Sequence, residues 1–164
     1  MSQSVLEPID FRTIEKETAQ EIWDKVRLQK DCFDDFTRDR ADIFLSRIIN
    51  PNSSTYRFHE GIVIFENIIP KLSADAHFFL WGRLRDGDII RLGRQALREA
   101  FDTYELHRLN ACIPTFNQTA KRIATRLGFR WEGQVKEQFL TGGVYRNIDI
   151  YGLLRQEFEM KGFR

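Results

Sequence analysis

The sequence predicts an α/β (α+β) fold: a mixed, mostly antiparallel sheet of about seven strands flanked by about four helices. Short runs rich in β-branched and aromatic residues alternate with segments of helical apolar spacing, and turn signals separate them. A chain of 164 residues with 42% apolar content is long enough to bury one core. No repeat, low-complexity tract or linker-like stretch interrupts it, so we predict a single domain over residues 1–164.

The first third of the chain is predicted to hold one short strand and two helices. The strand lies around Ile9–Ile14, and a helix follows over Ala19–Gln29. Thr18, with a Glu three residues later, forms a capping-box pattern at the start of that helix. Apolar spacing predicts a second helix over Arg38–Ile49, which ends before Pro51.

The middle of the chain is predicted to add three strands and a helix. Two strands, Thr55–His59 and Ile62–Ile69, flank the Glu60-Gly61 turn signal and read as a hairpin. Ala74–Trp81 is a nearly continuous apolar run, which indicates a strand buried on both faces. The helical spacing resumes over Leu92–Tyr104.

The last third is predicted to contain a strand, a helix and a long hairpin. Arg108–Pro114 is the strand, and the helix over Asn117–Leu127 stops at Gly128. Phe129–Leu140 and Val144–Leu154 then pair around a Gly-Gly turn.

Charge and cysteine content exclude several classes of function. The 25 basic and 24 acidic residues nearly cancel, and no basic stripe with interleaved aromatic residues is present, so neither a nucleic-acid nor a membrane partner is expected. Cys32 and Cys112 belong to no metal-ligand or redox spacing. No apolar run reaches the length of a membrane span and no leader pattern is visible, so a cytoplasmic location is expected.

The segment from Leu106 to Glu157 carries a series of short motifs in a fixed order. They are Leu106-His107-Arg108, Asn117, Leu127-Gly128-Phe129, Glu132-Gly133 and Leu153-Leu154-Arg155. With the predicted order of elements, the segment resembles the GNAT superfamily of N-acetyltransferases, in particular the branch that acetylates N-terminal amines of ribosomal proteins. The resemblance implies the GNAT fold, acetyl-CoA as cofactor, and transfer of acetyl to an amine of a protein or peptide.

In GNAT enzymes a Gly-rich loop between the fourth strand and the next helix holds the acetyl-CoA pyrophosphate, because free backbone N–H groups at a helix start suit an anion. The corresponding stretch here keeps only one of the two family glycines, Gly87, and Ile89 adds β-branched bulk. Asp86 and Asp88 would repel phosphate unless arginines outweigh them, and the candidates are Arg83, Arg85 and Arg91. Two alternatives follow: arginines hold the cofactor, or cofactor binding is lost.

The resemblance also assigns the remaining candidate site residues. Further cofactor contacts fall on the strand residues Phe79, Leu80 and Trp81, and on Asn117 and Lys121 of the later helix. Asn117 is equally a preferred helix N-cap. The Tyr that many members use to protonate the leaving thiolate is missing from residues 120–124.

His77 is the first candidate for the base that accepts the amine proton, because an imidazole titrates near neutral pH. Glu66 on the neighbouring strand is the second. Each residue also has a structural alternative. For His77 it is a hydrogen-bonded structural histidine, and for Glu66 it is a solvated carboxylate at the edge of the sheet.

Two functions therefore remain open. One is acetyl transfer to a protein or peptide amine. The other is a catalytically silent GNAT-like structural or interaction module, for which the partner would be a second copy of the chain or a large assembly such as a virus particle. The silent module predicts an occluded cofactor cleft, whereas the enzyme requires an open one.

Overall fold

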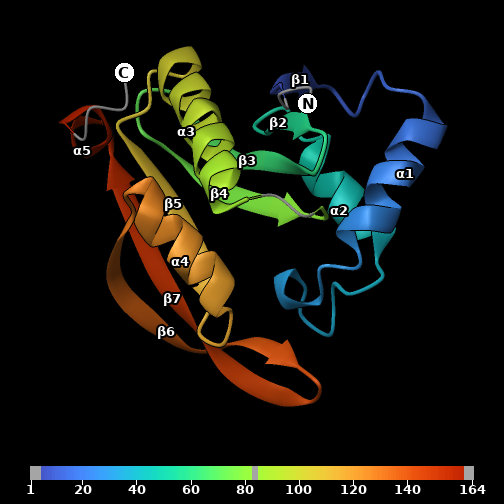
Figure 1. The fold of residues 1–164 in the computed structure, drawn as a ribbon. Coiled ribbons are helices and arrows are strands. Elements are labelled where there is room, and N and C mark those ends of the chain that lie inside the picture. Colours follow the sequence, from blue (N-terminus) through green and yellow to red (C-terminus); the bar gives the residue numbers. More distant parts are fainter. Residues whose placement is uncertain (1–4, 83–84, 161–164) are drawn as a thin grey trace.

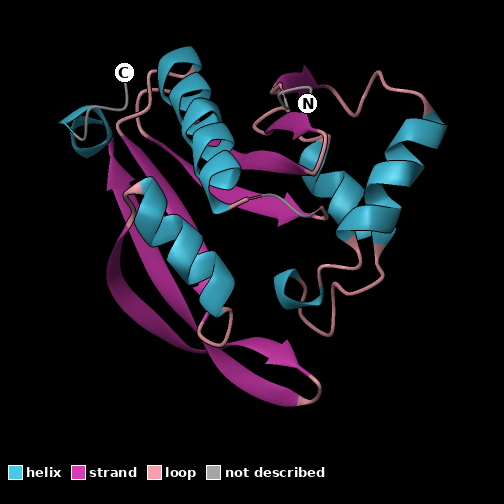
Figure 2. Ribbon diagram, in the orientation of Figure 1, coloured by secondary structure: helices cyan, strands magenta, loops and turns pink. Residues whose placement is uncertain are grey.

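The structure is a computed structural model that describes residues 5–82 and 85–160. One twisted sheet runs through the molecule, with α3 and α4 on one face and α1 and α2 on the other (Figures 1 and 2). The strands are β1 (Glu7–Ile9), β2 (Ser54–Phe58), β3 (Gly61–Ile69), β4 (Ser73–Leu80), β5 (Arg108–Pro114), β6 (Arg130–Thr141) and β7 (Val144–Leu154). The helices are α1 (Lys16–Val26), the 3₁₀ turn η1 (Lys30–Cys32), α2 (Ala41–Ile48), α3 (Asp86–Thr103), α4 (Gln118–Leu127) and α5 (Arg155–Met160).

The seven strands are ordered β1-β2-β3-β4-β5-β7-β6. Every neighbouring pair is antiparallel except β4 and β5, which are parallel. This parallel pairing joins only Ser73–Asp75 to Arg108–Asn110. Beyond those residues the two strands have no registered partners in each other, and the sheet opens at its centre.

A separate apolar cluster covers each face of the sheet. Beneath α3 and α4 the core is mainly aliphatic and includes Leu97, Leu109 and Leu127. Beneath α1 and α2 aromatic rings pack among aliphatic side chains, and the centroid of the Phe79 ring lies 5.8 Å from that of Phe33 and 6.0 Å from that of Phe44. None of the helices in the described part of the chain is long and apolar enough to span a membrane.

The predicted fold class and strand number are confirmed, and several local signals act as expected. Gly128 has a φ of 109° and ends α4, with its N–H donating to Ala124 and Thr125 carbonyls. Gly142 and Gly143, both with positive φ, form the turn of the β6–β7 hairpin. The β6–β7 register shifts between Trp131 and Gly133, which places a bulge in the Glu-Gly motif.

Several details differ from the prediction. The first strand, expected around Ile9–Ile14, is β1 at Glu7–Ile9, and the residues after it form turns. Helix α1 begins at Lys16 with Glu15 as N-cap, so Thr18 lies inside the helix and forms no capping box. Strand β4 is not buried on both faces, because its partly exposed residues His77 and Phe78 line a cavity. Helix α5 was not anticipated.

The largest difference is the start of α3 at Asp86, six residues before the predicted Leu92. The Asp-Gly-Asp sequence suggested a turn, but acidic residues in a first helical turn are stabilised by the helix dipole. Asp86 also accepts a hydrogen bond from Arg126 of α4 at 2.8 Å, which ties the start of α3 to its neighbour. Gly87 and Ile89 are therefore helical residues and not parts of a loop.

Candidate active site

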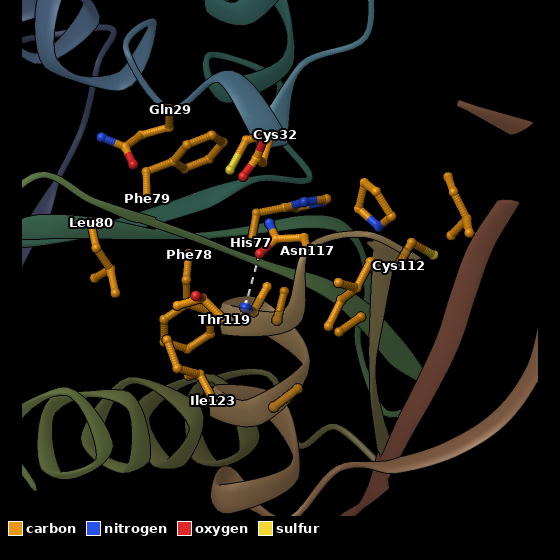
Figure 3. Close-up of a pocket in the computed structure, with 18 of the residues that line it drawn as sticks. Gln29, Cys32, His77, Phe78, Phe79, Leu80, Cys112, Asn117, Thr119 and Ile123 are labelled. Carbon is orange, nitrogen blue, oxygen red and sulfur yellow. Dashed lines mark hydrogen bonds between the residues drawn. The ribbon is translucent and has the colours of Figure 1, made fainter. Parts of the chain in front are cut away.

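The divergence of β4 and β5 creates a cavity of about 780 Å³. Its walls come from β4, β5, the first turns of α4 and the segment between α1 and α2 (Figure 3). Past Asp75, β4 is registered only with β3, so residues 76–80 have no strand partner on the side facing β5. Unpaired backbone groups beside a cavity are suited to hydrogen-bond a bound polar chain.

Successive side chains of β4 point to opposite sides of the sheet. Phe79 lies with Gln29 and Cys32 on the α1 side, whereas Phe78 points toward Ile123 of α4 (Figure 3). His77, two residues from Phe79, shares the α1 side. The cavity thus has two chemically different halves, one against α3 and α4 and one against the segment that joins α1 to α2.

His77 belongs to a three-residue polar chain on the α1 side. Its Nε2 lies 2.9 Å from Oε2 of Glu66 on β3. Arg47 of α2 donates from Nε to Oε1 of Glu66 at 2.9 Å and from its second nitrogen to Oε2. Glu66 is only 7% exposed, so it is not the solvated edge residue considered above.

The charge state of Glu66 follows from these contacts. Burial by itself would raise its pKa, but the hydrogen bonds and charges of His77 and Arg47 outweigh burial and lower the pKa to about 2. Glu66 is therefore ionised at neutral pH and too weak a base to remove a proton from an amine.

Asn117 caps α4, because its Oδ1 accepts a hydrogen bond from the Ala120 N–H at 3.0 Å (Figure 3). It also lines the cavity. Among the described residues its Nδ2 has no hydrogen-bond partner, so capping and ligand contact do not compete for the same atoms.

The expected phosphate-binding residues lie at the start of α3, outside the lining of the cavity. Arg85 is the N-cap residue of the helix and is exposed, and Arg91 lies in the second turn of α3. A Cβ at Gly87 would meet nothing within 4 Å, so the surface above the first turn is open. Arg83, the third candidate arginine, lies outside the described residues.

Two other residues that were expected to contact the cofactor, Trp81 and Lys121, have protein partners instead. The Trp81 indole donates to the His59 carbonyl at 3.1 Å and lies beneath the Lys25 ammonium. The Lys121 ammonium lies 2.8 Å from Oδ2 of Asp149 on β7. The same ammonium donates to the Thr115 carbonyl at 3.3 Å, so two of its three N–H groups already have partners.

Two residues at the site, Arg47 and Asp35, were not predicted from the sequence. Asp35 lies in the α1–α2 loop (residues 27–40), and its carboxylate accepts hydrogen bonds from the Gly142 and Gly143 N–H groups at 3.0 and 2.9 Å. The Asp35 N–H donates to the Leu140 carbonyl at 2.8 Å. The α1–α2 loop is thereby fastened to the tip of the β6–β7 hairpin across the α1 side of the cavity. No sequence signal links positions 107 residues apart.

Two curated proteins of Bacillus subtilis (strain 168) are related to this chain in sequence. One is named "Putative ribosomal N-acetyltransferase YdaF" and is 29% identical over 73 residues, which cover 44% of this chain and 40% of that protein. The other is the SPbeta prophage-derived uncharacterized N-acetyltransferase YokL, 33% identical over 64 residues, 39% of this chain and 36% of that protein. The matches thus span less than half of either relative. No family model matches the chain.

Solved structures show the same fold over the whole chain. A variant of the spermidine N-acetyltransferase SpeG from Vibrio cholerae superposes with a TM-score of 0.77 at 18% identity and covers 99% of both chains. The Vibrio cholerae spermidine N-acetyltransferase in complex with CoA and spermine gives a TM-score of 0.73 at 18% identity, covering 97% of this chain and 99% of that one.

Proposed function

We propose that this chain, which has the fold of the GNAT-type N-acetyltransferases, transfers an acetyl group from acetyl-CoA to an amine of a protein or peptide. The observation that carries the proposal is the open cavity where β4 and β5 separate, lined by unpaired β4 backbone. A silent module was expected to have an occluded cleft, and the cavity between β4 and β5 is open instead.

The cavity supplies complementary places for the cofactor. The backbone of residues 76–80 offers hydrogen bonds to the pantetheine amides, and Nδ2 of Asn117 faces the same space. Arg85 and Arg91, with the start of α3, would meet the phosphates. Acetyl-CoA, when bound, supplies a thioester whose carbonyl carbon bonds to the acceptor nitrogen while the C–S electron pair leaves with sulfur.

His77 is the proposed base. It lines the cavity on the α1 side with its side chain 28% exposed, so an acceptor amine can reach it directly or through one water. The imidazole takes the proton that the acceptor nitrogen loses. It later releases that proton, so that the sulfur leaves as a thiol and the imidazole is restored.

The charges in the cavity favour an acceptor with a single amine. The lining carboxylates among the described residues are Asp31 and Asp34, and Lys30 and Arg47 line it as well. Asp34 accepts hydrogen bonds from the Phe36 and Thr37 N–H groups. A polycation such as spermine needs several unpaired carboxylates, whereas a peptide amine carries one positive charge.

Binding and turnover test the proposal together. Millimolar acetyl-CoA should raise the midpoint of thermal unfolding, because a ligand at about 100 times its dissociation constant stabilises the folded state by about 3 kcal/mol. Acetyl transfer should be faster to a peptide with a free N-terminus than to spermidine.

A variant with a filled cavity provides the matched control. Ala120 lines the cavity and Thr125 is exposed on the same helix. Ala120→Phe should abolish the acetyl-CoA shift, and Thr125→Phe should retain it. No shift in the unmodified protein would refute cofactor binding, and faster transfer to spermidine would refute the peptide acceptor.

A further inference from the structure

We infer that Glu66, held by Arg47, is a positioning residue that fixes His77 as the tautomer with the proton on Nε2 and leaves Nδ1 as the atom that accepts the amine proton. The inference rests on the proposed function, because Nδ1 acts as a base only if an acceptor amine binds beside it. It assigns distinct roles to three residues from α2, β3 and β4.

The tautomer follows from the chemistry of the two partners. An ionised carboxylate has only acceptor atoms, so the 2.9 Å contact between Glu66 Oε2 and His77 Nε2 requires the proton to be on Nε2. In neutral imidazole the other nitrogen is then an unprotonated acceptor. Among the described residues, Nδ1 has no hydrogen-bond partner.

Arg47 holds the carboxylate in place. It donates two hydrogen bonds to the two oxygens of Glu66, and a planar guanidinium fixes the orientation of a carboxylate in this geometry. Because Glu66 cannot rotate without breaking these bonds, the direction of its third hydrogen bond is set toward His77. Arg47 reaches the pair from α2, so the packing of α2 on β3 positions the base.

Other charged and titratable groups near His77 come from three elements. They are Lys30, Asp31, Cys32 and Asp34 of the α1–α2 loop, Asp75 of β4 and Cys112 of β5. Asp75 accepts hydrogen bonds from the amide groups of Asn67 and Asn110 at 2.8 and 3.0 Å. Glu66 is the only described carboxylate that contacts the imidazole directly.

The tautomer can be read in the resting protein without any substrate. Long-range ¹H–¹⁵N correlation spectra of the ¹⁵N-labelled protein near pH 8 should show the proton of His77 on Nε2. A proton on Nδ1 would overturn the inference. This measurement needs no variant and no turnover, so it separates the inference from the proposed function.

Kinetics of variants test the role in catalysis. Glu66→Gln should lower kcat at least about 10-fold with little change in KM, and His77→Gln should lower it by about 100-fold or more. An unchanged kcat, or a loss that appears in KM and not in kcat, would overturn the inference.

Two further variants separate positioning from general stability. Asp42→Asn removes an exposed partner of Arg40 at the start of the same helix α2 and should leave kcat and KM unchanged. Arg47→Lys retains a charge beside Glu66 and should keep more activity than Arg47→Ala. If the unmodified protein shows the Nε2 proton and binds acetyl-CoA but acetylates no amine, the proposed function and the role of Nδ1 as base both fall, while the tautomer assignment stands.

Discussion

At the scale of single residues, Glu66 is a buried charged residue in the sheet. Its two oxygens receive hydrogen bonds from α2 and β4. The sequence marked Glu66 and His77 because of their strand positions, but it did not pair them. Their side chains point to the same face only because β3 and β4 align Ile64 with His77, and that register was not readable from either strand alone.

The lowered pKa of Glu66 predicts an acid-dependent loss of stability. A carboxyl whose pKa falls from 4.5 to about 2 on folding stabilises the protein fully above pH 4.5, and the contribution disappears as the pH falls toward 2. The loss is at most about 3 kcal/mol from this group. Urea unfolding at pH 7 and pH 3 should show a smaller difference in the free energy of unfolding for Glu66→Gln than for the unmodified protein. Equal differences would contradict the prediction.

At the scale of elements, the α1–α2 loop closes the half of the cavity that lies on the α1 side of the sheet. Phe33 packs on Phe79 of β4, and two residues later Asp35 binds the turn of the β6–β7 hairpin. The loop therefore connects the two halves of the sheet on the side opposite α3 and α4. Figure 1 shows the loop and the hairpin tip reaching toward each other below the opening of the sheet.

Removal of the Asp35 carboxylate should loosen this closure. Hydrogen bonds from the Gly143 and Gly142 N–H groups lower the pKa of Asp35, so its charged form is the one that binds the turn. Asp35→Ala should speed amide exchange at Gly142 and Gly143, measured by hydrogen–deuterium exchange, and leave the α3 core protected. Asp10→Ala is the control, because it removes an exposed ion pair with Arg12. It should not change the exchange rate of either glycine amide. Unchanged exchange in Asp35→Ala would show that the turn is held by other contacts.

At the scale of the whole molecule, the sheet consists of two halves that meet through three residue pairs between β4 and β5. One half carries β1 to β4, and the other carries β5 to β7. The Arg108–Glu132 ion pair crosses over Gly152 within the second half, where any Cβ would collide with both side chains. A ligand in the cavity would touch both halves.

Bound acetyl-CoA should therefore slow amide exchange in both halves of the sheet at once. Because unpaired backbone of residues 76–80 faces one side of the cavity and α4 the other, ligand binding should slow amide exchange in β4 and in the first turn of α4. The measurement is hydrogen–deuterium exchange with and without acetyl-CoA, and β1 serves as the internal control because it lies at the far edge of the sheet. Protection confined to one half would contradict binding in the cleft.

Local sequence patterns were enough to predict the seven strands and the helices α1 to α4 in their order, but not the 3₁₀ turn η1 or helix α5. Apolar periodicity, Gly128 and the Gly-Gly turn act through neighbours in the chain, so they can be recognised locally. The tertiary structure decided the early start of α3, the pairing of Glu66 with His77 and Arg47, and the closure by Asp35. Each depends on residues distant in sequence: Arg126 for the first turn of α3, the β3–β4 register and α2 for Glu66, and the hairpin turn for Asp35. Such contacts form only when the sheet is assembled, because its register and packing bring the partners within hydrogen-bond distance.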